Sequence, residues 1–184
     1  MPYRIVQIGA GPLGLKIYAM AQAKKTFNVV AAVDRNKELK DKDIGRLAGK
    51  RSAGVKVENS LKAALKNVKA DVAVLTTVSD METITPQIEE ILSYGLHVVS
   101  TCEELVYAWD EAPHLAQRID RAAKEAGVSV LATGVNPGFL MDALPAFFTG
   151  ICAKVDKVEA TRVQDAQFRR KPFLEKISKY KALF

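Results

Sequence analysis

The fold is decided by the stretch Tyr3-Arg4-Ile5-Val6-Gln7-Ile8-Gly9-Ala10-Gly11-Pro12-Leu13-Gly14, in which an apolar run leads into the spacing G-x-G-x-x-G. The run is typical of a buried strand, and a helical apolar spacing follows it at Leu13, Ile17, Met20 and Ala21. A second apolar run, Phe27 to Val33, ends at Asp34. Strand, glycines, helix, strand and terminal acid together indicate a dinucleotide-binding unit, whereas the glycines alone would also suit a turn in another α/β protein.

Each glycine of this stretch has a physical task. Gly9 allows a tight turn off the strand, Gly11 lets the backbone approach a pyrophosphate, and Gly14 lets the helix pack closely on the strand. The pyrophosphate would meet the free N–H groups at the start of the helix, so we place Pro12 and Leu13 in the same cofactor-binding turn.

The choice between NAD and NADP depends on the end of the second run. Asp34 would accept hydrogen bonds from the adenosine ribose and repel a 2′-phosphate, which favours NAD. Arg35 leaves NADP open, because its guanidinium can pair with a 2′-phosphate or stack on adenine.

Composition places the chain among globular proteins. Of the 184 residues, 48% are hydrophobic and 26% are charged. No secretory signal stands at the start, and the apolar segment from Phe139 to Ala153 is too short to span a membrane. The two cysteines form no disulfide framework, so we expect a cytoplasmic protein.

The net charge of +6 raises the question of nucleic-acid binding. The residues from Ala166 onward carry a balance of +5, so the preceding 165 residues sum to about +1. No nucleic-acid reading motif accompanies this charge, and we expect neither a nucleic acid nor a membrane as partner.

The remaining pattern alternates strand and helix. Short apolar runs recur at Val55–Val57, Val72–Leu75, Leu96–Val99 and Val128–Ala132, and helical stripes separate the later ones. Strict alternation predicts an α/β fold with a Rossmann-type doubly wound parallel sheet. We expect residues 1–135 to form the NAD(P)-binding domain and residues 136–184 to be the start of a substrate domain with a basic tail.

The start of the second domain has a different character. A helix opening at Met141 is expected to end by Gly150. The alternation from Val155 to Val163 predicts an antiparallel or edge strand.

Three segments that leave strands at the carboxyl edge carry candidate site residues. Thr76 and Thr77 follow the fourth strand and are expected to line the cofactor. Glu103 and Glu104 follow the fifth strand, where a carboxylate can bind a substrate ammonium or move a proton. The alternative is that both glutamates merely open the next helix, where acidic residues are favoured.

The third segment is Asn136-Pro137-Gly138, where the Asn amide can contact substrate or cofactor, although a plain turn explains it equally well. Cys102 is a possible nucleophile, but a buried structural thiol is the better interpretation. Neither His97 nor His114 has a second ligand at metal spacing, so we predict no metal site.

The sequence resembles the 2,4-diaminopentanoate dehydrogenase family, which is related to dihydrodipicolinate reductase and the native amine dehydrogenases. The resemblance rests on Val6 to Gly14, on Val98-Val99-Ser100-Thr101-Cys102-Glu103-Glu104-Leu105, and on Thr133 to Asp142. It extends to Asp165 and to Arg169-Arg170-Lys171-Pro172.

The resemblance implies NAD(P)-dependent oxidative deamination of 2,4-diaminopentanoate, or a related small amine, to 2-amino-4-oxopentanoate and ammonia in ornithine degradation. It implies that hydride leaves the amine-bearing carbon for the nicotinamide and that water hydrolyses the imine. It also implies a catalytic glutamate beside the nicotinamide, at Glu104 with Glu103 as the alternative, and substrate contacts at Asn136 and Gly138.

Two alternatives to this activity stay open. Family members are roughly twice as long, so a non-catalytic dinucleotide-binding module or fragment is one alternative. A dihydrodipicolinate reductase-like imine or ene reductase is the other, although its paired-histidine and lysine motif is missing. Apolar residues in the tail, Phe173, Leu174, Ile177 and Phe184, would lack a partner in a monomer, so we expect a homodimer.

Overall fold

The computed structural model of the chain describes residues 1–163. It divides into two compact units, Met1–Leu140 and Met141–Phe184. The expected domain boundary after residue 135 lies five residues before this division. The basic tail and the residues named from Asp165 onward lie outside the described residues.

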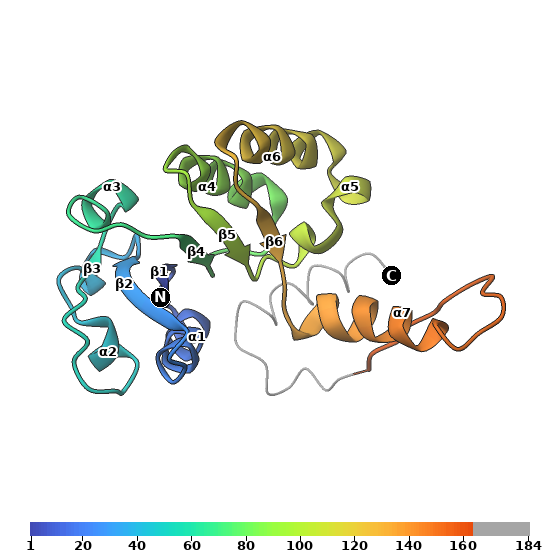
Figure 1. Cartoon of the computed structure of the whole chain (residues 1–184), viewed down its shortest axis with the longest axis horizontal. Helices are drawn as coiled ribbons and strands as arrows, with labels where there is room; N and C mark the ends of the chain where they lie inside the picture. Colours follow the sequence, from blue (N-terminus) through green and yellow to red (C-terminus); the bar gives the residue numbers. More distant parts are fainter. Residues whose placement is uncertain (164–184) are drawn as a thin grey trace, which may run out of the picture. The chain divides into compact units, whose positions relative to one another are not determined.

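The first unit is built on a six-stranded parallel sheet (Figure 1). Its strands are β1 (Tyr3–Ile8), β2 (Phe27–Val33), β3 (Val57–Glu58), β4 (Val72–Leu75), β5 (His97–Ser100) and β6 (Val130–Ala132). They lie in the order β3-β2-β1-β4-β5-β6, so the direction of winding reverses between β1 and β4. This confirms the predicted Rossmann-type doubly wound sheet.

Helices connect the strands, as the alternation predicts. They are α1 (Pro12–Gln22), η1 (Lys37–Leu39), α2 (Ile44–Leu47), α3 (Leu61–Ala64), α4 (Met81–Ser93), η2 (Glu104–Tyr107), α5 (Ala108–Glu111) and α6 (Pro113–Ala126). Local chemistry sets their ends. The Asp80 carboxylate accepts the Thr83 N–H (2.8 Å) at the start of α4, and Gly127 ends α6 in the left-handed conformation.

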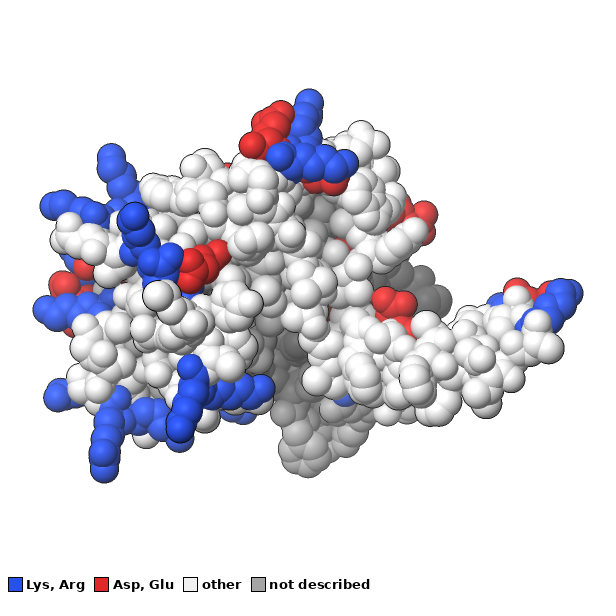
Figure 2. All heavy atoms as spheres, in the orientation of Figure 1, with Lys and Arg blue, Asp and Glu red and all other residues white. Residues whose placement is uncertain are grey.

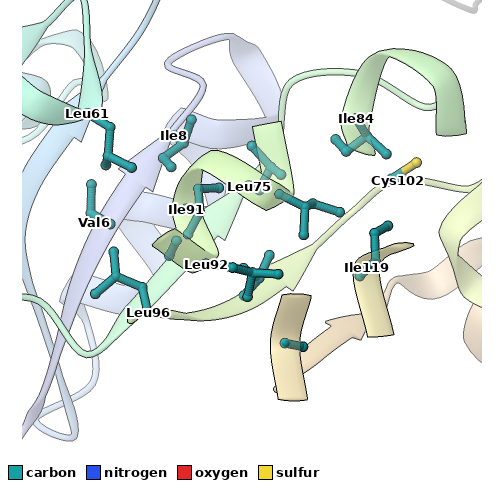
Figure 3. Close-up of a cluster of buried hydrophobic side chains, with 14 of the residues drawn as sticks. Val6, Ile8, Leu61, Leu75, Ile84, Ile91, Leu92, Leu96, Cys102 and Ile119 are labelled. Carbon is teal, nitrogen blue, oxygen red and sulfur yellow. The ribbon is translucent and has the colours of Figure 1, made fainter. Parts of the chain in front are cut away.

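The two faces of the sheet carry separate cores. Residues of α3, α4 and α6 pack on one face, where Val6, Leu75, Ile91 and Ile119 belong to one buried cluster (Figure 3). On the other face, α1 and α2 contribute Tyr18 and Ile44 to a second cluster. The residues Ile84, Ile88, Ile91 and Leu92 stand at helical spacing on α4, and all four are buried.

Burial on the second face declines across the sheet. Gln7, Val74, Val99 and Leu131 stand in register on β1, β4, β5 and β6. Gln7 is 1% exposed, Val74 and Val99 are half-buried, and Leu131 is 58% exposed. The first face of the same strands stays buried at Leu75 and Val98. The part of the sheet from β4 to β6 is thus well covered on one face only.

The second unit begins within η3 (Val135–Ala143), which continues into α7 (Leu144–Thr149). The helix ends at Gly150, as expected, but its first residues precede the predicted start at Met141. The predicted strand from Val155 to Val163 is wrong, because these residues form no strand. Alternation of apolar and polar residues stabilises a strand only where a neighbouring strand accepts its hydrogen bonds. Nearly all of these side chains are instead exposed.

Candidate functional site

The glycine loop between β1 and α1 brings the start of the helix into close contact with the end of the strand. Gly9 adopts φ +94°, a conformation that favours glycine. A Cβ atom on Gly14 would overlap the carbonyl oxygen of Gly9 and lie 2.7 Å from the Thr76 hydroxyl. A Cβ on Gly11 would meet no protein atom within 4 Å, so this backbone faces open space where a phosphate can approach.

A buried polar network supports the loop from below. Gln7 donates its side-chain N–H groups to the Gly9 carbonyl and the Thr76 hydroxyl, each at 3.0 Å. The Thr76 Oγ1 in turn lies within 3.1 Å of the carbonyl oxygens of Ile8 and Gly9. The role of Gln7 is not predicted from the sequence, although a glutamine inside an apolar strand is a signal that it has polar partners.

A cleft of about 390 Å³ opens at the carboxyl edge, where the winding of the sheet reverses. Of the predicted cofactor residues, those that line it are Gly9, Gly11, Asp34, Arg35, Thr76 and Thr77. Pro12, Leu13 and Gly14 form the first turn of α1 beside it. Sequence reasoning missed other lining residues, namely Asn59, Ser60, Thr83, Gln87 and Glu90. Asn59 and Ser60 directly follow β3, and polar residues at the carboxyl end of a strand are a sequence signal that could have identified them.

The Asp34 carboxylate is held at one end of this cleft by backbone N–H groups. Its Oδ2 accepts the Ala10 N–H (2.7 Å) and its Oδ1 accepts the Asn36 N–H (2.8 Å). Asn59 also donates to the Asp34 carbonyl (2.8 Å), which ties β3 to the end of β2. The carboxylate is therefore fixed at the position where the glycine motif predicts an adenosine ribose, and Arg35 beside it is exposed.

The helix after the glycines is rotated relative to expectation. The predicted buried face included Leu13 and Met20, but these are 42% and 68% exposed, while Gly14 and Tyr18 are buried. Because Gly14 must face the sheet to pass close to Gly9, the residue one turn later, Tyr18, also faces inward. The close approach of the backbones therefore decides the rotation of α1, and this part of the prediction was wrong.

Backbone hydrogen bonds join the strand ends along the carboxyl edge. Thr76, Thr101 and Thr133 each follow a strand, and each donates its N–H to the last carbonyl of the neighbouring strand, at 2.8–3.1 Å. The segments that we expected to carry chemistry are thus brought to one edge.

The two glutamates occupy distinct positions on this edge. Glu103 is half-buried and precedes η2, whereas Glu104 is exposed in its first turn. The Glu104 Oε2 accepts the Met81 N–H (2.8 Å), so this carboxylate binds the start of α4, far away in sequence. Neither interpretation of the sequence included this contact, which fixes a carboxylate between the loops after β4 and β5.

The segment Asn136-Pro137-Gly138 lies close to these loops. Its Asn136–Pro137 peptide bond is cis, and Asn136 is extended. A Cβ built on Gly138 would lie 3.8 Å from Val106 of η2, so the turn approaches the element that carries Glu104. The structure thus brings Gly138 near the segment that carries Glu104. The lining of the cleft includes none of Glu103, Glu104, Asn136 and Gly138.

Cys102 is 1% exposed, and burial raises the pKa of its thiol. A buried protonated thiol is a poor nucleophile, which agrees with the structural interpretation.

Within residues 1–163 no group of three or more His, Cys, Asp and Glu side chains is arranged to hold a metal ion. In the same residues, no helix has the length and apolar character that crossing a bilayer requires.

The donor set of the cleft fits a dinucleotide. Open backbone at Gly11 and the start of an eleven-residue helix suit a pyrophosphate, and a fixed carboxylate suits ribose hydroxyls.

Residues 3–107 match the protein family described as "Dihydrodipicolinate reductase, N-terminus". More than half of the chain is included in this match.

Similar proteins extend well beyond the length of this chain. The 2,4-diaminopentanoate dehydrogenase of Acetoanaerobium sticklandii is 34% identical over 164 residues, covering 87% of this chain and 46% of that protein. The structure of an amine dehydrogenase from Mycobacterium smegmatis is 25% identical with a TM-score of 0.78, covering 85% of this chain and 46% of that one. The WlbA dehydrogenase of Bordetella pertussis, solved with NADH and UDP-GlcNAcA, is 26% identical with a TM-score of 0.55, covering 72% and 35%. This chain therefore spans about half the length of the curated relative.

Proposed function

The chain belongs to the family of the dihydrodipicolinate reductase N-terminal domain, and from this premise we propose that it binds NAD or NADP for the oxidative deamination of a small amine. The observation that carries the proposal is the cleft formed by the glycine loop, α1 and Asp34. Two similar proteins, a 2,4-diaminopentanoate dehydrogenase and an amine dehydrogenase, support the amine as the substrate class.

We propose that the chain prefers NAD to NADP. The Asp34 carboxylate is fixed by two backbone N–H groups, so its charge cannot easily move away from a 2′-phosphate. Calorimetric titration is expected to show NAD binding at least about tenfold more tightly than NADP, which is about 1.4 kcal/mol. Equal affinities would contradict the preference and assign Arg35 to the 2′-phosphate.

In the proposed reaction, a bound oxidised nicotinamide supplies the acceptor for the hydride. The Glu104 carboxylate would accept a proton from the substrate ammonium, with its Oε2 held by the Met81 N–H at the start of α4. The Asn136 amide would donate to a substrate carboxylate, and Gly138 lies against Val106 of the same segment as Glu104. Glu103, half-buried on the same segment, is the alternative proton acceptor.

The role of Glu104 is tested by Glu104→Gln. The glutamine oxygen can still accept the Met81 N–H, so the variant loses the charge and keeps the contact. We expect amine-dependent NADH formation to fall at least about a hundredfold, while NAD binding stays unchanged. Glu103→Gln is the matched control, and a larger loss there would move the catalytic role to Glu103.

A second candidate function is a dinucleotide-binding module without turnover. The exposure of Leu131 and of the Glu104 segment favours it, because an open site leaves substrate and nicotinamide in contact with water. Saturable NAD binding with no turnover of 2,4-diaminopentanoate or related amines would support this alternative. Reduction of a cyclic imine by NADH, without amine oxidation, would instead support the reductase activity of the wider family.

A further inference from the structure

Charge is segregated between the two halves of the first unit. Between Lys16 and Lys69 the sequence carries fourteen Lys and Arg against five Asp and Glu, whereas between Asp71 and Glu125 it carries three against eleven. The formal net charges are +9 and −8. The net charge of about +1 before the tail is therefore the sum of a strongly basic and a strongly acidic segment. In Figure 2 the basic side chains gather over the side that carries α2, β3 and α3.

The basic half is not neutralised by neighbours. Within the described part of the chain, none of its fourteen Lys and Arg side chains forms a salt bridge with an Asp or Glu. In the acidic half, by contrast, two of the three basic side chains are paired, Arg118 with Glu89 and Lys124 with Asp120. All fourteen of these basic side chains are also exposed to solvent.

The boundary between the halves coincides with the cleft. Chain order places the basic half around β2, β3, α2 and α3, and the acidic half around β4, β5, α4 and α6. The sheet reverses between β1 and β4, and the cleft at that edge takes Arg35 and Asn59 from one half and Thr77 and Glu90 from the other. A ligand that enters the cleft lies across this boundary.

We infer that the basic half is a guide surface that attracts the phosphate end of a dinucleotide and speeds its association with the cleft. The inference rests on the proposed cofactor. A pyrophosphate is negative and an oxidised nicotinamide is positive, so the two fields also align the ligand, with its phosphates toward the basic half. Fields of this kind raise association rates by about 10- to 1,000-fold, and salt screens them over about 8 Å at physiological ionic strength.

The experiment measures the association rate of NADH with the full chain by stopped-flow fluorescence at low and high salt. The test variant Lys37→Gln/Lys62→Gln/Lys66→Gln removes three charges of the basic half, none of which belongs to the cleft lining. The control variant Arg118→Gln/Arg121→Gln/Lys124→Gln removes three charges from α6 in the acidic half. Thermal unfolding and the circular dichroism spectrum verify that both variants are folded.

We expect the unmodified chain to associate about tenfold more slowly at high salt, and the test variant to associate about three- to fivefold more slowly than the unmodified chain at low salt. The control variant should stay within about twofold. Equal slowing in both variants would overturn the inference, because net charge alone would then explain the slower association. An association rate that does not change with salt would also overturn it. Absence of NADH binding to the unmodified chain would instead refute the proposed function itself, and the inference with it.

Discussion

The two halves of the sheet are assembled from the same strand–helix repeat, but they differ in how completely they are covered. Around β1 and β2 both faces are buried, with Val6 and Ile8 under one set of helices and Ile5 and Val29 under the other. Around β5 and β6 one face is buried at Val98, while Leu131 on the opposite face is largely exposed. Within residues 1–163, the sheet is therefore covered on both faces at β1 and β2 but well covered on only one face at β5 and β6.

The largest expected effect compares the two faces of the open half. Leu75→Ala removes a fully buried side chain and should lower the free energy of unfolding by about 2–5 kcal/mol. Leu131→Ala should change it by less than about 0.5 kcal/mol, because most of that side chain already contacts solvent. Urea unfolding of both variants measures the difference, and a loss above about 2 kcal/mol for Leu131→Ala would show that its face is covered in solution.

Two glycines test the well-covered half of the sheet, where β1 meets α1. Gly14→Ala forces α1 away from Gly9 and should cost about 1–3 kcal/mol of stability. Gly11→Ala meets no protein atom within 4 Å and only places alanine at the N-cap of α1, so it should cost less, about 0.5–1 kcal/mol. It should weaken NAD binding at least about tenfold. Chemical unfolding and calorimetry separate the two. If Gly11→Ala bound NAD normally, a pyrophosphate could not lie against this backbone.

A smaller effect is expected in the loop between β2 and β3. Asp43 accepts N–H groups from Arg46, Ala53 and Gly54 and the hydroxyl of Ser52. Burial raises the pKa of this carboxyl, but the hydrogen bonds from Ala53, Arg46, Ser52 and Gly54 outweigh it and lower the pKa to about 2. Asp43→Ala should cost about 1 kcal/mol as a lost helix cap.

The pH dependence of this contribution has a definite sign. Because the folded-state pKa lies below the ordinary value of 3.8, the stabilisation is present above about pH 4 and is lost as the pH falls toward 2. Thermal unfolding of the unmodified chain and of Asp43→Ala across this range should show the two stabilities converging. A constant difference would mean that the charged carboxylate is not what the loop binds.

The smallest effect concerns the ion pair that joins α4 to α6 in the open half. Arg118 donates to both carboxylate oxygens of Glu89, at 3.1 and 2.8 Å, from an exposed position. Arg118→Gln should lower the melting temperature slightly at low salt and not at high salt, because solvent and ions screen such pairs. A loss that persists at high salt would indicate that the packing of the arginine stem, rather than its charge, joins the helices.

The parallel sheet and the carboxyl-edge position of the candidate residues could be predicted from the sequence, because short apolar runs that alternate with helical stripes indicate buried parallel strands. The rotation of α1 about its axis could not be predicted. It depends on the close approach of the Gly14 and Gly9 backbones, whereas the prediction used only the spacing of apolar side chains. The contact of Glu104 with Met81 was also inaccessible, because it joins two loops that only the folded sheet brings together. The expected strand at Val155–Val163 failed for the opposite reason, because this local pattern finds no partner strand among residues 1–163.

The row of threonine amides at the carboxyl edge has a consequence for how the site opens. The N–H groups of Thr76, Thr101 and Thr133 are bound to the last carbonyls of neighbouring strands, so their protons can exchange with solvent only when adjacent strands separate. These amides should therefore exchange with deuterium on the slow timescale of the sheet, whereas the exposed ends of the same loops exchange quickly. The edge that receives the ligand would then open only when the sheet itself opens.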